Sequence, residues 1–197
     1  MLSVQGGTVL PFSTMKERET EGTAPSAGIR KEAFAHGFSA QVSFWPGGDD
    51  RVRPRGTLGI CGMNGTAEGS RDADLQYLAY GLSAGAQVSL SSRPRGRGPY
   101  AFSELRLDWE FFKAKSPGQG WASFGLGSRR CLRLGLGAGL GWVAPRTGLT
   151  LEVEVRASLT GPISDQNPQG ESAFWAELPP DRYLRLGLGW TWGRGGR

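Results

Sequence analysis

The sequence predicts an all-β chain of eight antiparallel strands, joined in order as a meander and closed into an up-and-down barrel. Three observations support this prediction. Apolar residues alternate with glycine or polar residues, no stretch has a convincing helical period, and long connections alternate with shorter ones. The 197 residues fit one barrel domain spanning 1–197.

Two glycine-rich segments show the alternation most clearly. Between Cys131 and Trp142 every second residue is apolar, and four of the five residues between them are glycines. The same pattern returns from Leu184 to Trp192. Strict alternation places one set of side chains on each face of a strand, so both segments are predicted to be strands.

Six further segments follow the same period of two. They are Val4–Phe12, Phe34–Phe44, Val52–Ile60, Leu78–Leu90, Leu105–Phe111 and Leu149–Leu159. The long connections are 13–32, 64–74, 113–129 and 160–182, and the shorter ones are 46–50, 92–99 and 145–148. Alternate connections of a meander lie at opposite ends, so the four long loops share one end and both termini lie with the short turns.

The alternation fits two kinds of protein, because the apolar face can meet lipid or can pack inside a soluble β-sandwich or lipocalin-like binder. Repeated glycine weakens a solvated strand, whereas in the narrow lumen of an eight-stranded barrel it leaves room for long side chains. Six arginines and five acids share the glycine face, a near balance that favours enclosed ion pairs. The predicted lumen charges are Arg53, Arg55, Glu104, Arg106, Asp108, Glu110, Arg133, Glu152, Glu154, Arg156 and Arg185.

Aromatic residues on the apolar face gather at the strand ends. Phe44, Trp142, Trp190 and Trp192 fall at the short-turn end, and Phe12, Phe34, Trp109 and Phe111 fall at the long-loop end. Two aromatic girdles around an aliphatic band are typical of a β-barrel that crosses a bilayer. The sequence therefore predicts a bacterial outer-membrane barrel with both termini periplasmic, surrounded by outer-membrane lipid and lipopolysaccharide. No signal peptide is evident, so a mature form is expected.

The last strand, Arg185–Trp192, and the opening segment Gly6–Phe12 resemble the small outer-membrane barrel group that includes OmpA-like transmembrane, OmpX-like and opacity-type proteins. In the last strand a polar residue is followed by a glycine and then by two aromatics. This pattern resembles the signal read by the barrel-assembly machinery, which the resemblance implies as a partner during insertion. The tail Gly193–Arg197 departs from that pattern, which usually ends at the aromatic.

The sequence offers no catalytic, cofactor or metal site. His36 is the single histidine, and neither Cys61 nor Cys131 has metal-site spacing; both thiols are expected to be free and buried. A lipid A-modifying enzyme of the same fold, the alternative, would use His36 with a serine. His36 and Ser39 lie on opposite faces of one predicted strand, which argues against this alternative.

The favoured function is a non-enzymatic barrel that anchors exposed loops for structural, adhesion or surface-binding roles. Phe174 and Trp175, in the last long loop, are the candidate contacts for a protein or glycan partner. A narrow, charge-filled lumen disfavours an open pore. The net charge of +5 is scattered along the chain, so no nucleic-acid partner is expected.

Overall fold

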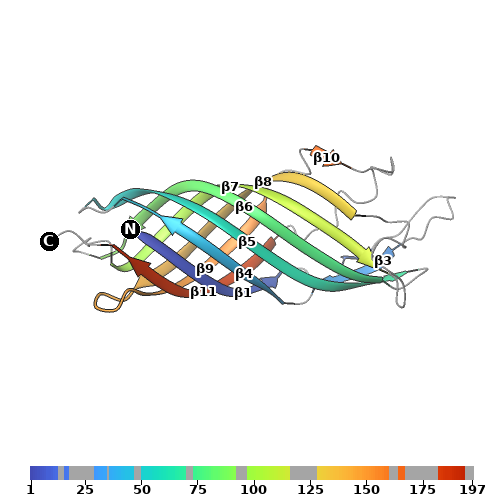
Figure 1. The fold of residues 1–197 in the computed structure, drawn as a ribbon, viewed down its shortest axis with the longest axis horizontal. Coiled ribbons are helices and arrows are strands. Elements are labelled where there is room, and N and C mark those ends of the chain that lie inside the picture. The colour runs from blue at the N-terminus through green and yellow to red at the C-terminus, as the bar shows by residue number, and fades with distance from the viewer. Residues whose placement is uncertain are drawn as a thin grey trace.

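Eight antiparallel strands form a closed barrel in the computed structural model, which describes residues 1–12, 16–17, 29–34, 36–46, 50–69, 73–91, 97–115, 128–159, 164–166 and 182–193. The order around the barrel is β1–β4–β5–β6–β7–β8–β9–β11, and β11 pairs with β1 to close the ring. The predicted meander is therefore confirmed (Figure 1). The described part of the chain contains no helix suited to crossing a membrane.

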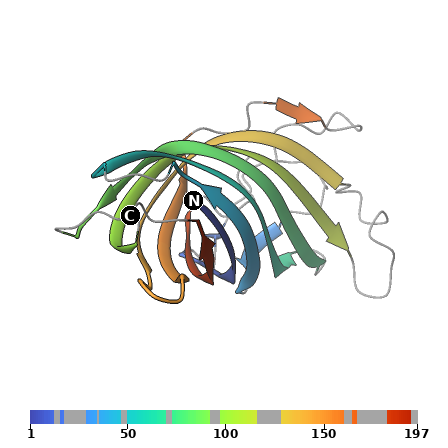
Figure 2. The same ribbon diagram turned by 60° about the vertical axis from the view of Figure 1, so that its left-hand side comes forward.

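The barrel strands differ in length, and four consecutive strands are the longest. The barrel strands are β1 (Leu2–Pro11), β4 (Gly37–Phe44), β5 (Val52–Gly69), β6 (Ala73–Ser89), β7 (Gly98–Lys115), β8 (Ser128–Val143), β9 (Leu149–Ser158) and β11 (Arg182–Trp192). Strands β5 to β8 run further toward the long-loop end than the others, and form the tall wall visible in Figure 2.

Three short strands extend this wall: β2 (Lys16–Glu17), β3 (Ile29–Phe34) and β10 (Ser164–Gln166). β3 pairs with the distal part of β5 and β10 pairs with the start of β8. The predicted strand 34–44 is thus divided between β3 and β4. The pairing of β1 with β4 ends at Gly37, and the earlier residues of β3 lie between β5 and the short strand β2 instead.

The predicted loop 64–74 was wrong, because most of it is strand. β5 and β6 stay paired through Ala67 and Ala73, which leaves only residues 70–72 between the two strands. The segment Asn64–Gly69 lacks apolar alternation. Alternation records a difference between the two faces of a strand, and it fades once both faces of a ladder leave the membrane.

The alternating leucines and valines of the barrel strands mostly face outward. Leu58, Leu105, Leu140 and Leu188 are 55–60% exposed, whereas their polar neighbours on the same strands are buried. A soluble sandwich would bury these leucines between its two sheets. The predicted outward direction of the apolar face is therefore confirmed, in a closed barrel and not in a two-sheet sandwich.

Glycines fit close to large side chains on both faces of the wall. Inside, a Cβ on Gly137 would lie 2.6 Å from Glu154 Oε1, and one on Gly187 would lie 2.6 Å from Arg185 Nη2. Outside, the Phe38 ring covers Gly62, the residue paired with it on β5. Each glycine therefore makes room for a neighbour that any larger residue would displace.

Met1 and the end of β11 both lie at the short-turn end (Figure 1). The backbones of Met1 and Trp45 exchange hydrogen bonds there: the Met1 ammonium donates to the Trp45 carbonyl at 2.5 Å, and the Trp45 amide donates to the Met1 carbonyl at 3.1 Å. The 145–148 turn ends at Gly148, whose φ of 79° favours glycine. The Thr191 amide donates to the Gly148 carbonyl at 2.8 Å, which ties this turn to the last strand.

Candidate functional site

The barrel interior holds an ion-pair network with Glu152, on β9, at its centre. Its carboxylate accepts hydrogen bonds from Arg55 Nη1 at 2.7 Å and Arg185 Nη1 at 3.2 Å. Gln41 Nε2 donates to it at 2.9 Å and the Tyr100 hydroxyl at 2.5 Å. Five strands, β4, β5, β7, β9 and β11, thus meet at one buried carboxylate, and the network crosses the lumen instead of following one wall.

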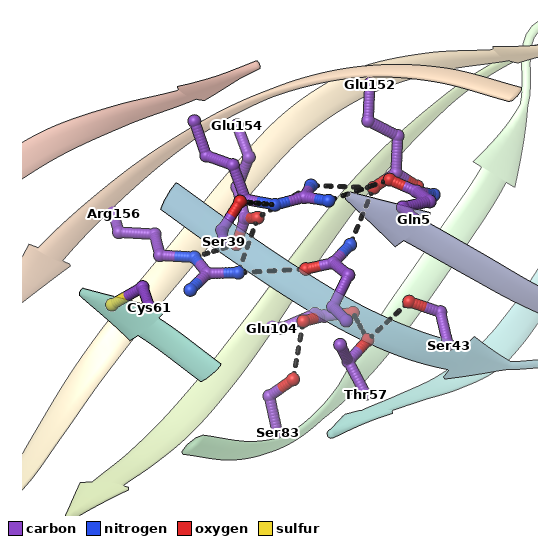
Figure 3. Close-up of polar contacts among 12 residues, drawn as sticks. Gln5, Ser39, Ser43, Thr57, Cys61, Ser83, Glu104, Glu152, Glu154 and Arg156 are labelled. Atoms are coloured by element: carbon purple, nitrogen blue, oxygen red, sulfur yellow. Dashed lines mark hydrogen bonds and ion pairs between the residues drawn. The ribbon is translucent and has the colours of Figure 1, made fainter. Parts of the chain in front are cut away.

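Glu154 forms a second centre beside Glu152 (Figure 3). Arg156 holds it with two parallel hydrogen bonds, Nε to Oε1 at 2.8 Å and Nη2 to Oε2 at 2.9 Å. This forked geometry is the one that guanidinium and carboxylate groups form best. Arg185 Nη1 lies 3.6 Å from Oε2 of Glu154 and 3.2 Å from Oε2 of Glu152, so it links the two centres.

Glu104, on β7, completes the middle of the network. Its Oε1 accepts from Arg55 Nε at 2.6 Å and from the Thr57 hydroxyl at 2.8 Å, and its Oε2 accepts from the Ser83 hydroxyl at 2.5 Å (Figure 3). Small hydroxyl side chains from β5 and β6, the two strands next to β7 on one side, therefore fill the hydrogen-bonding role that Arg55 leaves open. Such complete pairing is what makes a buried charge tolerable.

A further set of charges lies toward the long-loop end. Arg133 Nε lies 2.7 Å from Glu110 Oε2, and the Tyr77 hydroxyl donates to Glu110 Oε1 at 2.9 Å. Arg106 Nη2 donates to Asp108 Oδ1 at 3.1 Å. Ion pairs thus extend along the barrel well beyond the Glu152 centre.

Three aromatic rings line the lumen toward the short-turn end. Trp45 and Tyr100 are 6.4 Å apart between ring centroids, and Tyr100 and Phe102 are 6.2 Å apart. The Arg55 guanidinium lies over the Phe102 ring at 4.1 Å, within cation–π distance. Since all three rings are buried, they narrow this end of the lumen below the ion pairs.

The structure places the eleven predicted charges inside the barrel. All are buried except Asp108, whose side chain is 16% exposed. Arg53 differs from the rest because it lies at the short-turn mouth, where its Nε donates to the Asp50 carbonyl at 2.9 Å. The remaining ten comprise five arginines and five acids, so the enclosed charges balance.

The predicted aromatic residues are found on the outer face where their side chains are described. Phe12, Phe44, Trp109, Trp142, Trp190 and Trp192 are exposed, and Phe111 is partly exposed against Tyr80. Trp109 and Phe111 lie within β7 and not at its end, because β7 continues to Lys115. The side chain of Phe34, and the loop residues Phe174 and Trp175, lie outside the described residues.

The fold does not bring His36 and Ser39, the pair considered for catalysis, into contact. His36 is exposed, whereas Ser39 is buried and accepts a hydrogen bond from Arg185 Nε at 3.2 Å. Cys61 is a buried free thiol 3.6 Å from the Tyr183 hydroxyl; the side chain of Cys131 lies outside the described set. Within the described residues, no three His, Cys, Asp or Glu side chains are grouped to hold a metal ion.

The sequence prediction missed the uncharged half of the network. Gln5 accepts from Arg185 Nη2 at 2.9 Å, and Gln41 accepts from Arg156 Nη2 at 2.9 Å. Both occupy the same face as the predicted charges, alternating with the apolar residues of β1 and β4. The alternation of polar and apolar positions was therefore the available signal. Applied to every polar residue and not to the charged ones alone, it would have identified Gln5 and Gln41.

The short-turn end carries exposed basic side chains. Arg51 and Arg146 are exposed, and Arg97 is partly exposed and donates to the Pro145 carbonyl, which joins two neighbouring turns. Partial burial and the neighbouring Arg53 guanidinium lower the pKa of the Met1 amine below its ordinary value. Positive charge is therefore concentrated at this mouth.

A closed eight-stranded wall with an apolar exterior and paired interior charges is the structure of a small outer-membrane β-barrel. No protein-family model and no curated protein sequence matches the chain.

Among solved structures, the chain is similar to Ail, the attachment invasion locus protein of Yersinia pestis, with a TM-score of 0.54 and 16% identity over 96% of each chain. A structure of that protein in complex with the heparin analogue sucrose octasulfate gives a TM-score of 0.53 and 14% identity over 96% of each chain. The likeness is one of fold.

Proposed function

We propose that this protein is a non-enzymatic outer-membrane barrel that presents its long loops for adhesion or surface binding. The observation that supports this function is the enclosed network around Glu152, which joins opposite walls of the barrel. A lumen crossed by ion pairs and lined by the buried rings of Trp45 and Tyr100 favours a closed barrel over an open pore. The loops are then the parts of the molecule left to meet other molecules.

A sulfated glycan is the partner class that best fits the sequence around the loop between β7 and β8, including the strand ends that flank it. Segment 112–130 contains Lys113, Lys115, Arg129 and Arg130 and no acid, whereas segment 159–182 has four acids and one arginine. The ligand class is taken from the Yersinia pestis protein in complex with a heparin analogue. Clustered basic side chains bind sulfate groups by the same charge-assisted hydrogen bonds that hold phosphate.

Heparin–agarose binding by the refolded protein tests the glycan proposal. The variant Lys113→Gln/Arg129→Gln/Arg130→Gln is expected to elute at lower salt than the parent protein. The matched control Arg51→Gln/Arg97→Gln/Arg146→Gln removes the same number of charges at the other end and should elute as the parent does. If both variants shift equally, heparin reports net charge alone and the glycan proposal fails.

Planar-bilayer recording tests the closed lumen. The parent protein should give no steady single-channel conductance, because the ion pairs block the barrel. A stable open conductance from the parent protein would contradict the anchoring function and favour a pore.

We expect the short turns and both termini to face the periplasm, because outer-membrane barrels have short periplasmic turns and the last-strand pattern resembles theirs. A cysteine introduced by Thr147→Cys, in a Cys61→Ser/Cys131→Ser background, should react with an impermeant maleimide only after the outer membrane is opened. Labelling in intact cells would reverse the orientation without changing the fold.

A further inference from the structure

The net charge of the protein resides almost entirely at the short-turn end. Residues 1, 45–51, 90–97, 144–148 and 193–197 carry seven arginines and two aspartates, a net side-chain charge of +5. The long-loop segments 12–36, 64–77, 112–130 and 159–182 carry ten basic and eleven acidic residues. The barrel segments carry six arginines and five acids. The net charge thus comes mainly from the segments next to the short-turn ends of the strands, where the structure describes Arg51, Arg97 and Arg146.

Every basic side chain of this end is an arginine. Among those described, Arg51 and Arg146 are exposed and Arg97 is partly exposed, and they come from three different turns. Arginine differs from lysine in that its planar fork forms paired hydrogen bonds with phosphate. We define Arg51, Arg97 and Arg146 as the arginine rim.

The turn that carries Arg146, one member of the arginine rim, lies next to the aromatic girdle. Trp142 and Trp190 face outward near the ends of β8 and β11, and the turn that carries Arg146 is hydrogen-bonded to Thr191 between the two outward tryptophans of β11. Outward tryptophans mark the level of the lipid headgroups. Because the 144–148 turn is short, Arg146 remains within one side-chain length of that level.

We propose that the arginine rim binds the phosphate groups of anionic phospholipid headgroups in the leaflet that surrounds the short-turn end. Phosphate is the anion present at this depth, and the forked guanidinium groups and the positive field of this end both select for it. A soluble polyanion fits less well, because the Arg146 turn adjoins the lipid-facing girdle. The leaflet that the rim contacts depends on the proposed orientation of the barrel. The class of lipid that it binds is the same in either orientation.

Lipid selectivity can be measured in vesicles with the same composition in both leaflets, so the test is independent of orientation. The full chain is refolded with Trp109→Phe, which leaves Trp142, Trp190 and Trp192 as the lipid-facing tryptophans among the described residues. Quenching by brominated phosphatidylglycerol is compared with quenching by brominated phosphatidylcholine. The rim variant is Arg51→Gln/Arg97→Gln/Arg146→Gln, and the control is Lys113→Gln/Arg129→Gln/Arg130→Gln.

The parent and the control variant should be quenched preferentially by phosphatidylglycerol, and high salt should reduce this preference. The preference should fall by roughly fivefold for each rim arginine removed. A version with lysine at the three rim positions should keep part of it, since charge remains but the fork is lost. A heat-modifiable shift on an unboiled gel establishes that each variant has folded.

Two results would overturn the proposal. One is equal quenching by the two lipids in the parent protein, or a preference that the rim variant retains. The other is absence of a lipid preference together with rim-dependent co-sedimentation with peptidoglycan sacculi, which would assign the rim to a cell-wall polymer. Either result leaves the loop function intact, because heparin binding and lipid quenching report opposite ends of the barrel.

Discussion

Replacing Glu152 by glutamine tests whether the enclosed network stabilises the barrel. Glutamine has nearly the same volume and keeps one oxygen, so it changes the charge and little else. Arg55 and Arg185, at 2.7 and 3.2 Å, would each lose an anionic partner. The enclosed set of five arginines and five acids would become five against four, leaving one positive charge uncompensated inside the barrel.

Breaking a buried ion pair by removing one partner typically costs about 3–5 kcal/mol. We therefore expect Glu152→Gln to lower the free energy of unfolding by about that amount. The measurement is the guanidinium unfolding midpoint in detergent micelles, followed by tryptophan fluorescence and by the mobility of unboiled samples on a gel. Asp50→Asn makes the same chemical change on an exposed residue and serves as the matched control.

A double-mutant cycle with Arg185→Met measures the interaction energy between Glu152 and Arg185 apart from their other contacts. Removing both partners restores the balance of charge, so the double variant should be less destabilised than the sum of the single variants. The reasoning is refuted if Glu152→Gln costs no more than Asp50→Asn, because the interior would then be hydrated well enough to accept an unpaired arginine.

Three further outcomes are expected. Leu105→Arg, on the lipid face, should destabilise the barrel in vesicles by about 2–4 kcal/mol, and an unchanged unfolding midpoint would contradict the outward assignment. Gly141→Ala should cost about 1–3 kcal/mol, since a Cβ there would lie 2.6 Å from Tyr100 Cε2, and Tyr100→Leu should relieve much of this loss in the same assay. In a Cys131→Ser background, Cys61 should resist maleimide until the protein unfolds; rapid labelling of the folded form would show that water reaches the upper lumen.

Much of the fold is encoded locally and could be predicted from the sequence. A strand with lipid on one face and ion pairs on the other needs two alternating residue classes, so Leu151, Glu152 and Val153 reveal their faces without a structure. The order of long and short connections indicates the meander for the same reason, because each hairpin pairs neighbours in the chain.

The partners within the lumen could not be predicted, because they depend on shear and on the lengths of side chains that cross the barrel. Arg55 contacts Glu152 although 97 positions separate them in the chain. Trp45 was also missed as a lumen residue, since the aromatic positions were interpreted only as girdles. The extension of β5 and β6 could not be predicted for a different reason: residues 64–69 show no apolar alternation, and a strand leaves no period of two where its two faces carry similar residues.

The convergence of five strands on Glu152 has a consequence for insertion. Until β4, β5, β7, β9 and β11 are all in place, at least one arginine or carboxylate of the centre would face hydrocarbon without its counter-ion, at a cost of several kcal/mol. A half-assembled sheet is consequently unstable in the bilayer. The polar interior therefore favours the closed barrel over any open precursor in the membrane, because only the closed barrel pairs all of these charges.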